Sequence, residues 1–174
     1  MTRTFNLRPF ENANGVSILV GMEIDDGAIH FKFEILSKTQ ITFETLKSEL
    51  SRERKDELWK SNCFELFFSF GQASYFEMNL SPSGDWQFYE FETYRQRAAL
   101  PNEFQIFQLQ SQKSKDGYEI SGTIESQTLN LTEIQSLHPC VILNLNGKNS
   151  FWAPQHNLGS PDFHCRSTWS NWKD

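Results

Sequence analysis

The sequence has few cysteines, and their pattern argues against two common uses of the residue. Cys63, Cys140 and Cys165 are odd in number and none lies in a CxxC pair. A small disulfide-stabilised domain or a zinc knuckle calls for an even, closely spaced set. We therefore expect three reduced thiols, no disulfide framework and no resident metal.

Positive charge is also scarce. The chain has 16 Lys and Arg against 22 Asp and Glu, giving a net charge of −6 and a pI near 5.2. A phosphate backbone is bound by a basic surface, so nucleic acid is not predicted as a partner. The basic stretch Arg52–Lys55 is interrupted by Glu53 and followed by two acids, which is typical of a solvated surface.

Long hydrophobic runs are absent as well. No stretch reaches the length that crosses a bilayer, so no membrane partner is predicted. The first 15 residues, MTRTFNLRPFENANG, contain neither a continuous apolar region nor a small-residue cleavage site. Together with the reduced thiols, this predicts a cytoplasmic location. The sequence predicts no oligomeric state.

The chain instead has a repeated two-residue alternation of apolar and polar side chains. We expect a strand over Ala28–Leu36, paired with Val16–Ile24 through the turn Asp25-Asp26-Gly27. Brief helical signals occur at Arg52–Lys60 and around Leu129, Ile134 and Leu137. Further strands are expected over Cys63–Phe70, Ser74–Leu80, Asp85–Glu92, Phe104–Leu109, Tyr118–Ile124 and Val141–Leu145, with turn residues at Gly71-Gln72-Ala73 and Ser81–Gly84.

Short strands with little helix between them predict one all-β domain over residues 1–174. The expected architecture is an antiparallel β-sandwich of jelly-roll or immunoglobulin-like type, with one or two short helices. A parallel sheet would need crossover helices that this chain lacks.

The stretch Leu58–Arg95 is the most unusual part of the sequence. About a third of it is aromatic, and polar side chains are interspersed among the rings. Side chains alternate across a sheet, so Phe64, Leu66 and Phe68 share the face expected to point between the two sheets. Glu65 then lies on the opposite face with Glu77 and Asn79, and the two glutamates are potential cross-strand neighbours.

Two interpretations of this mixed face remain open. In one, the carboxylates are solvent-facing or pair internally with Arg95 or Lys60. In the other, the oxygens of Glu65, Glu77 and Asn79 bind hydroxyl groups while the rings offer flat apolar surfaces. That combination suits a sugar. Arg95 either clamps a ligand carboxylate or stacks on an aromatic ring, or it forms an ion pair with Glu65, Glu77 or Glu92.

The C-terminal stretch Ser150–His164 gathers His156, Asp162 and His164 near Trp152. Its spacing matches no metal motif, so no metal ligand set is assigned. Asp162 is equally suited to capping a turn. Haem is kept as an alternative cofactor, although Met78 falls on the apolar parity and is expected to pack in the core.

Three segments together resemble a known family: LWKSNCFELFF, YFEMNLSPSGDWQFYEFETYR and FWAPQHNLGSPDFH. They are similar to an uncharacterised bacterial family of DOMON-like domains, related in fold to the family 9 carbohydrate-binding modules. The resemblance implies a β-sandwich of the kind that binds sugars or haem. By motif position it implies these ligand-binding candidates: Trp59, Glu65, Glu77, Asn79, Trp86, Tyr94, Arg95, Trp152, His156, Asp162 and His164.

We therefore predict a non-catalytic module that binds a small molecule, most simply a carbohydrate, with no catalytic residue assigned. A glycan-processing enzyme using Glu65 and Glu77 as acid and base is one alternative. A haem or other cofactor module is the other.

Overall fold

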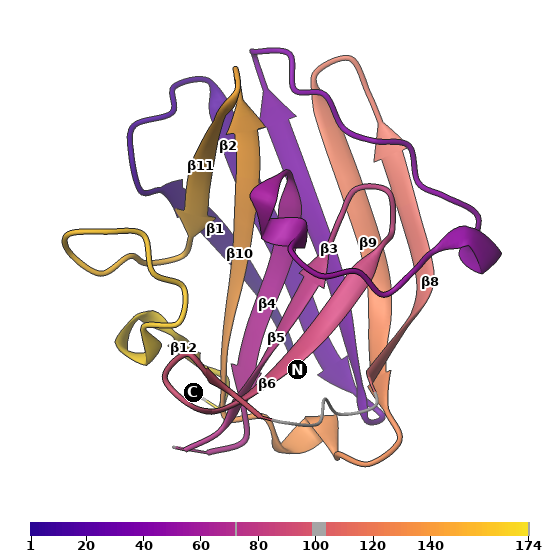
Figure 1. Cartoon of the computed structure of the whole chain (residues 1–174), viewed down its shortest axis with the longest axis vertical. Helices are drawn as coiled ribbons and strands as arrows, with labels where there is room; N and C mark the ends of the chain where they lie inside the picture. Colours follow the sequence, from indigo (N-terminus) through magenta and orange to yellow (C-terminus); the bar gives the residue numbers. More distant parts are fainter. Residues whose placement is uncertain (72, 99–103, 174) are drawn as a thin grey trace.

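The computed structural model describes residues 1–71, 73–98 and 104–173 (Figure 1). Gln72, in the predicted connection at residues 71–73, lies outside the described residues. Within the described part, no helix has the length and apolar character needed to span a bilayer.

Two antiparallel sheets form the sandwich that the sequence predicts. Sheet A runs in the order β1-β2-β3-β9-β8 and sheet B in the order β7-β6-β5-β4-β10-β11. Figure 1 shows the two layers stacked along the view, with the C-terminal segment in yellow at one side of sheet B. The strands of sheet A are β1 (Thr2–Pro9), β2 (Val16–Asp25), β3 (Ala28–Ser37), β8 (Phe104–Lys113) and β9 (Gly117–Ser126).

Sheet B carries the aromatic stretch. Its strands are β4 (Cys63–Ser69), β5 (Tyr75–Leu80), β6 (Trp86–Thr93), β7 (Gln96–Arg97), β10 (Ser136–Leu145) and β11 (Lys148–Ala153), and the two-residue β12 (Ser170–Asn171) pairs with β10. The end of β1 pairs with β11, where Arg8 faces Ala153, and so joins the sheets at one edge.

The β2–β3 hairpin follows from its turn residues. Asp25 pairs with Ala28, leaving Asp26 and Gly27 as a two-residue loop with φ values of 41° and 82°. Positive φ at both loop positions matches the right-handed twist of the flanking strands, and Asp-Gly tolerates it. The turn expected from the sequence is therefore confirmed.

The main core lies between the sheets and uses the predicted parity. Phe64, Leu66 and Phe68 of β4 pack there, and Met78 of β5 joins them as expected. A second apolar cluster covers the outer face of sheet B, where Phe67 and Tyr75 contact Phe163 and its neighbours in the C-terminal segment. Both faces of β4 and β5 are thus buried.

The expected short helices are single 3-10 turns at Glu49–Ser51, Leu58–Lys60, Leu131–Glu133 and Arg166–Thr168. Of the helical signal expected over Arg52–Lys60, only the single turn at Leu58–Lys60 forms, and the residues before it are not helical. Instead, Trp86 N–H donates to the Glu53 carbonyl and Lys55 N–H to the Trp86 carbonyl, so this segment extends the sheet at β6. Leu137, expected in a helical turn, lies in β10, because a short apolar run fits a strand as well as a helix.

The motif Ser81–Asp85 has a structural use. Lys47 Nζ lies 2.8 and 2.7 Å from the two carboxylate oxygens of Asp85, which also accepts the Glu53 N–H at 3.1 Å. These bonds fasten the long connection between β3 and β4 to the β5–β6 turn. Gly84 is required there, because its φ is +89° and an added Cβ would lie 2.8 Å from Leu46.

Candidate functional site

A pocket of about 390 Å³ opens on the outer face of sheet B, beneath the C-terminal segment. Polar side chains from β4, β5, β7, the β6–β7 turn and the C-terminal segment meet aromatic side chains there. The pocket is lined by Trp59, Glu65, Phe67, Glu77, Phe91, Arg95, Arg97, Ile142, Phe151, Pro161, Phe163 and His164.

Glu65 and Glu77 reach this pocket from β4 and β5, and both are nearly inaccessible, at 2% and 6% exposed. The strand register places Glu65 opposite Asn79 and Glu77 opposite Phe67, so the two glutamates are diagonal rather than directly opposed. Neither is a solvent-facing residue, and the partners expected for them bind elsewhere. Lys60 pairs with Glu57, and Arg95 pairs with Asp162.

Burial gives both carboxyl groups a raised pKa. For Glu65, burial raises the pKa well above its usual range and the nearby Glu77 raises it further. For Glu77, burial raises the pKa to about 7, although the Asn79 hydrogen bond and the charges of Arg97 and Arg95 oppose the shift. A protonated Glu65 offers one O–H donor, and Glu77 offers acceptors. The pocket therefore presents both kinds of hydrogen-bonding group.

Asn79 forms a hydrogen bond that holds Glu77 in place. It is 0% exposed, and its side-chain Nδ2 donates to Glu77 Oε1 at 2.9 Å. The bond fixes one oxygen of Glu77 and leaves Oε2 facing His164. Asn79 is therefore placed to orient a ligand-binding group instead of touching a ligand itself.

His164 lies on the other side of Glu77. Tyr75 Oη accepts the Arg95 main-chain N–H at 3.0 Å and lies 2.8 Å from His164 Nδ1. Because the Tyr75 oxygen already accepts one hydrogen bond, we assign the Tyr75 O–H as the donor to Nδ1. The neutral His164 ring then carries its proton on Nε2. Nε2 is 3.7 Å from Glu77 Oε2, beyond hydrogen-bonding distance. Burial, with the charge of Arg95, lowers the pKa of His164 to about 4, so this histidine is neutral near pH 7.

The β6–β7 turn holds Arg95 at the rim. Thr93 pairs with Gln96, and Arg95 adopts a left-handed conformation with φ of 56°. Its guanidinium donates to Asp162 Oδ1 at 2.9 Å, and Tyr94 Oη donates to Asp162 Oδ2 at 2.6 Å. Burial pushes the pKa of Asp162 upward, but the hydrogen bonds from Tyr94 and Arg95 outweigh it and hold the pKa below its usual range. These bonds join the C-terminal segment to sheet B.

Arg97 lines the pocket, and Tyr75 and Tyr89 contact its lining residues, although none of the three is among the predicted ligand-binding residues. The Arg97 guanidinium carbon lies 3.9 Å from the centroid of the Tyr89 ring and 5.6 Å from that of Trp59. Cation–π contact with two rings holds the arginine over the pocket's aromatic wall. The signal that points to Arg97 is the register, since it faces Phe91 across the β6–β7 turn.

The structure brings eight of the predicted residues together and places three elsewhere. Trp86 faces the inter-sheet side with Phe88 and lies 4.9 Å from the guanidinium carbon of Arg54. Trp152 is 1% exposed in the main core, and the alternation of β11 puts its neighbour Phe151 in the pocket instead. His156 Nε2 bonds the Arg8 carbonyl at 2.8 Å, beside the pocket.

The residues considered for other chemistry have protein partners or are buried. His156, Asp162 and His164 bond Arg8, Arg95 and Tyr75 respectively. In the described ranges, no group of three or more His, Cys, Asp or Glu side chains is arranged to hold a metal ion. The thiols of Cys63 and Cys140 are fully buried, and burial raises the pKa of each well above its usual value, with Glu65 adding to the shift. Thiols held protonated in this way are poor nucleophiles.

Comparison with known proteins finds relatives by three-dimensional structure and none by sequence. Neither a protein-family model nor a curated protein matches the chain. A Bacteroides uniformis protein with a provisional carbohydrate-binding description superposes with a TM-score of 0.62 at 11% identity, covering 95% of this chain and 84% of that one.

A family 9 carbohydrate-binding module from Caldicellulosiruptor kristjanssonii, in complex with cellotriose, superposes with a TM-score of 0.57. It is also 11% identical, over 91% of this chain and 75% of that one. The predicted antiparallel β-sandwich and its fold relation to family 9 modules are therefore confirmed.

Proposed function

We propose that this protein is a non-catalytic carbohydrate-binding module whose ligand occupies the pocket on the outer face of sheet B. The observation that carries the proposal is the convergence of Glu65, Glu77 and Arg97 with aromatic rings in one accessible pocket. Buried carboxyl groups are costly, and a face built for packing alone would have apolar side chains there. Hydroxyl groups of a ligand satisfy these carboxyls.

The chemistry of the pocket matches a pyranose ring. Trp59, Phe91 and Phe151 supply apolar surfaces against which the C–H face of a sugar packs. Glu77 accepts hydrogen bonds from ring hydroxyls, and protonated Glu65 donates one. The Arg97 guanidinium, held over Tyr89, donates to ring or glycosidic oxygens.

The structural relatives support this proposal through their fold, since both are described as carbohydrate-binding and one holds cellotriose. We also propose that residues 1–174 form one DOMON-like domain. The sequence motifs that carry this resemblance lie on β4, β5, β6 and the C-terminal segment, which together build the pocket.

A matched pair of tryptophans tests the proposal. Trp59 and Trp86 are both half-buried, and an arginine lies over each ring, but Trp59 alone lines the pocket. A glycan array identifies the ligand, and calorimetry then measures affinity. We expect Trp59→Ala to weaken binding at least tenfold and Trp86→Ala to change it less than twofold. Absence of binding across neutral, acidic and cell-wall sugars contradicts the proposal, as does equal weakening by both variants.

One observation favours a second candidate, a glycan-processing enzyme. Glu65 and Glu77 lie together with raised pKa values, as general acids in glycosidases do. The candidate is tested by incubating the wild type with the glycans that bind and analysing the products by chromatography. Cleavage that Glu77→Gln abolishes without loss of binding supports the enzyme. Intact glycans after prolonged incubation exclude it.

A further inference from the structure

A second hollow, of about 250 Å³, adjoins the pocket. The two share Phe151 and Pro161 in their walls, so these residues form a saddle between them. The far side of the second hollow is built by the connection from β1 to β2 and by the β10–β11 turn. Its lining residues are Phe10, Glu11, Asn12, Ala13, Leu145, Lys148, Asn149, Ser150, Phe151 and Pro161.

Aromatic contacts hold this saddle in place. Phe10 N–H donates to the Phe151 carbonyl at 2.8 Å, which ties the second hollow to β11. The His156 ring meets Phe10 edge-on at 5.5 Å between centroids and Phe163 at 6.3 Å. Phe163 in turn contacts Phe151 at 6.1 Å. One continuous aromatic floor therefore runs from the first pocket into the second hollow.

His156 gains a use from this arrangement. Its Nε2 lies 2.8 Å from the Arg8 carbonyl oxygen, which can only accept a hydrogen bond. Nε2 is therefore the donor and carries a ring proton. His156 itself lines neither hollow, and its ring contacts with Phe10 and Phe163 support the saddle. Hydrogen-bonding groups continue beyond it, where the Lys148 ammonium and the Glu11 carboxylate form an exposed pair at 2.7 Å.

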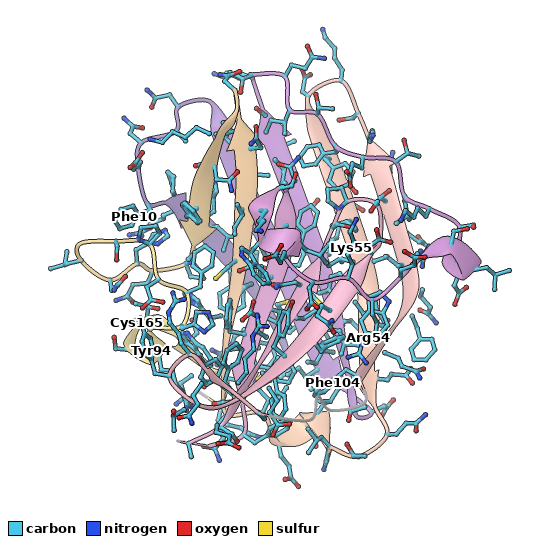
Figure 2. The ribbon with its side chains drawn as sticks, viewed as in Figure 1. Phe10, Arg54, Lys55, Tyr94, Phe104 and Cys165 are labelled. Atoms are coloured by element: carbon cyan, nitrogen blue, oxygen red, sulfur yellow. The ribbon has the colours of Figure 1, made fainter. Side chains whose placement is uncertain are left out.

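The combined groove is long. It crosses sheet B from Phe91 on β6 over β5, β4, β10 and β11 to Phe10 at the end of β1. These are five strand spacings of about 4.8 Å each, or about 24 Å in total. Figure 2 shows Phe10, at one end of the groove, and Tyr94, in the turn that follows β6, along the same side of the molecule, with Cys165 of the C-terminal segment between their levels. One sugar ring fills only part of such a groove.

We infer that the ligand is a linear oligosaccharide of at least three units, bound across sheet B with one end in the Glu65–Glu77 pocket and the other beside Phe10 and Lys148. This inference rests on the proposed function and adds the length of the ligand to it. The second hollow is a subsite in which Phe10 and Phe151 contact sugar rings and Lys148 and Asn149 bind hydroxyl groups.

Calorimetry with oligosaccharides of one to six units tests the inference, using the cello-, xylo-, manno- and chito- series. We expect affinity for the binding series to rise at least tenfold between two and four units. Phe10→Ala should remove that gain while leaving the affinity for the disaccharide within twofold of the wild type. Lys148→Ala, a change of an exposed side chain, should remove part of the gain. Phe43→Ala is the matched control, because this half-buried phenylalanine lines a different hollow, and it should leave every affinity unchanged.

The possible failures are distinguishable. Equal affinity from one to six units, or an equal loss at all lengths in both Phe10→Ala and Lys148→Ala, overturns the inference while the proposed function stands. Absence of binding at every length in every series overturns both. Trp59→Ala separates the two subsites further, because it should weaken binding at all lengths.

Discussion

The ionisation of Glu77 gives the sharpest test of the buried site. Burial raises its pKa from 4.5 to about 7. A carboxyl group that binds its proton more tightly in the folded than in the unfolded state contributes stability below pH 4.5, and this contribution is lost as the pH rises through the folded pKa. A pKa shift of 2.5 units corresponds to a loss of about 3 kcal/mol in the free energy of unfolding once Glu77 is fully ionised in the folded protein. About 2 to 3 kcal/mol of this loss falls between pH 5 and pH 8.

The Glu77→Gln side chain does not ionise, so the variant does not lose this stability as the pH rises. It keeps the shape of the side chain, including an oxygen that accepts the hydrogen bond of Asn79. Urea unfolding at pH 5 and pH 8 should show that the variant gains about 2 to 3 kcal/mol relative to the wild type between these two pH values. Titrating groups that Glu77 does not influence cancel in the comparison, because both proteins contain them. Glu65 does not cancel, because Glu77 raises its pKa, and losing that influence adds to the gain of the variant at the higher pH. Glu125→Gln, an exposed change on β9, is the control and should differ from the wild type by less than about 0.5 kcal/mol at both pH values.

The reasoning fails if the free-energy difference between Glu77→Gln and the wild type is the same at pH 5 and pH 8. That result would mean that Glu77 ionises in the folded protein as easily as in the unfolded chain, and hence that water solvates the pocket fully.

Two further predictions concern residues outside the pocket. Asp85→Ala leaves the Glu53 N–H without its acceptor and Lys47 without its partner, and we expect a loss of about 2 to 4 kcal/mol in urea unfolding with glycan affinity unchanged; a loss below about 0.5 kcal/mol would contradict this account of the turn. His138 is 0% exposed, its ring nitrogens have no hydrogen-bond partner among the described residues, and burial lowers its pKa to about 3. A histidine kept neutral in the folded state costs stability as the pH falls below 6.5, so His138→Phe should gain about 2 kcal/mol relative to the wild type between pH 7.5 and pH 5; an unchanged difference across this range would show that His138 is protonated in the folded protein.

The sandwich was predictable because its signals are local. The Asp26-Gly27 turn and the alternation in β3 each specify their own structure, and the parity of β4 and β5 separated the core face from the site face correctly. Strands β1 and β11 were missed, although Phe5 and Leu7 alternate with polar residues, and the polar end of β8 after the irregularity near Gln108 was missed too.

The site was predictable in part, because its residues come from separate strands. Parity placed Glu65 and Glu77 on one face, but their exact register depends on how β4 pairs with β5 and appears only in the structure. Applying the same parity to β6 and β11 would have directed attention from Trp86 and Trp152 to Tyr89 and Phe151. The burial of the outer face by the C-terminal segment, through Asp162 and His164, is a contact between distant parts of the chain that no local pattern reveals.

The central claim is that a sugar binds over Glu65, Glu77 and Trp59. It is tested most directly by recording ¹H–¹⁵N NMR spectra while the tightest-binding oligosaccharide is added. We predict that the shifted signals cluster at the indole N–H of Trp59, the Arg97 guanidinium and the backbone around Phe163. Shifts gathered instead around Thr39, Phe43 and Tyr118, which line a larger hollow of about 530 Å³, would contradict the account.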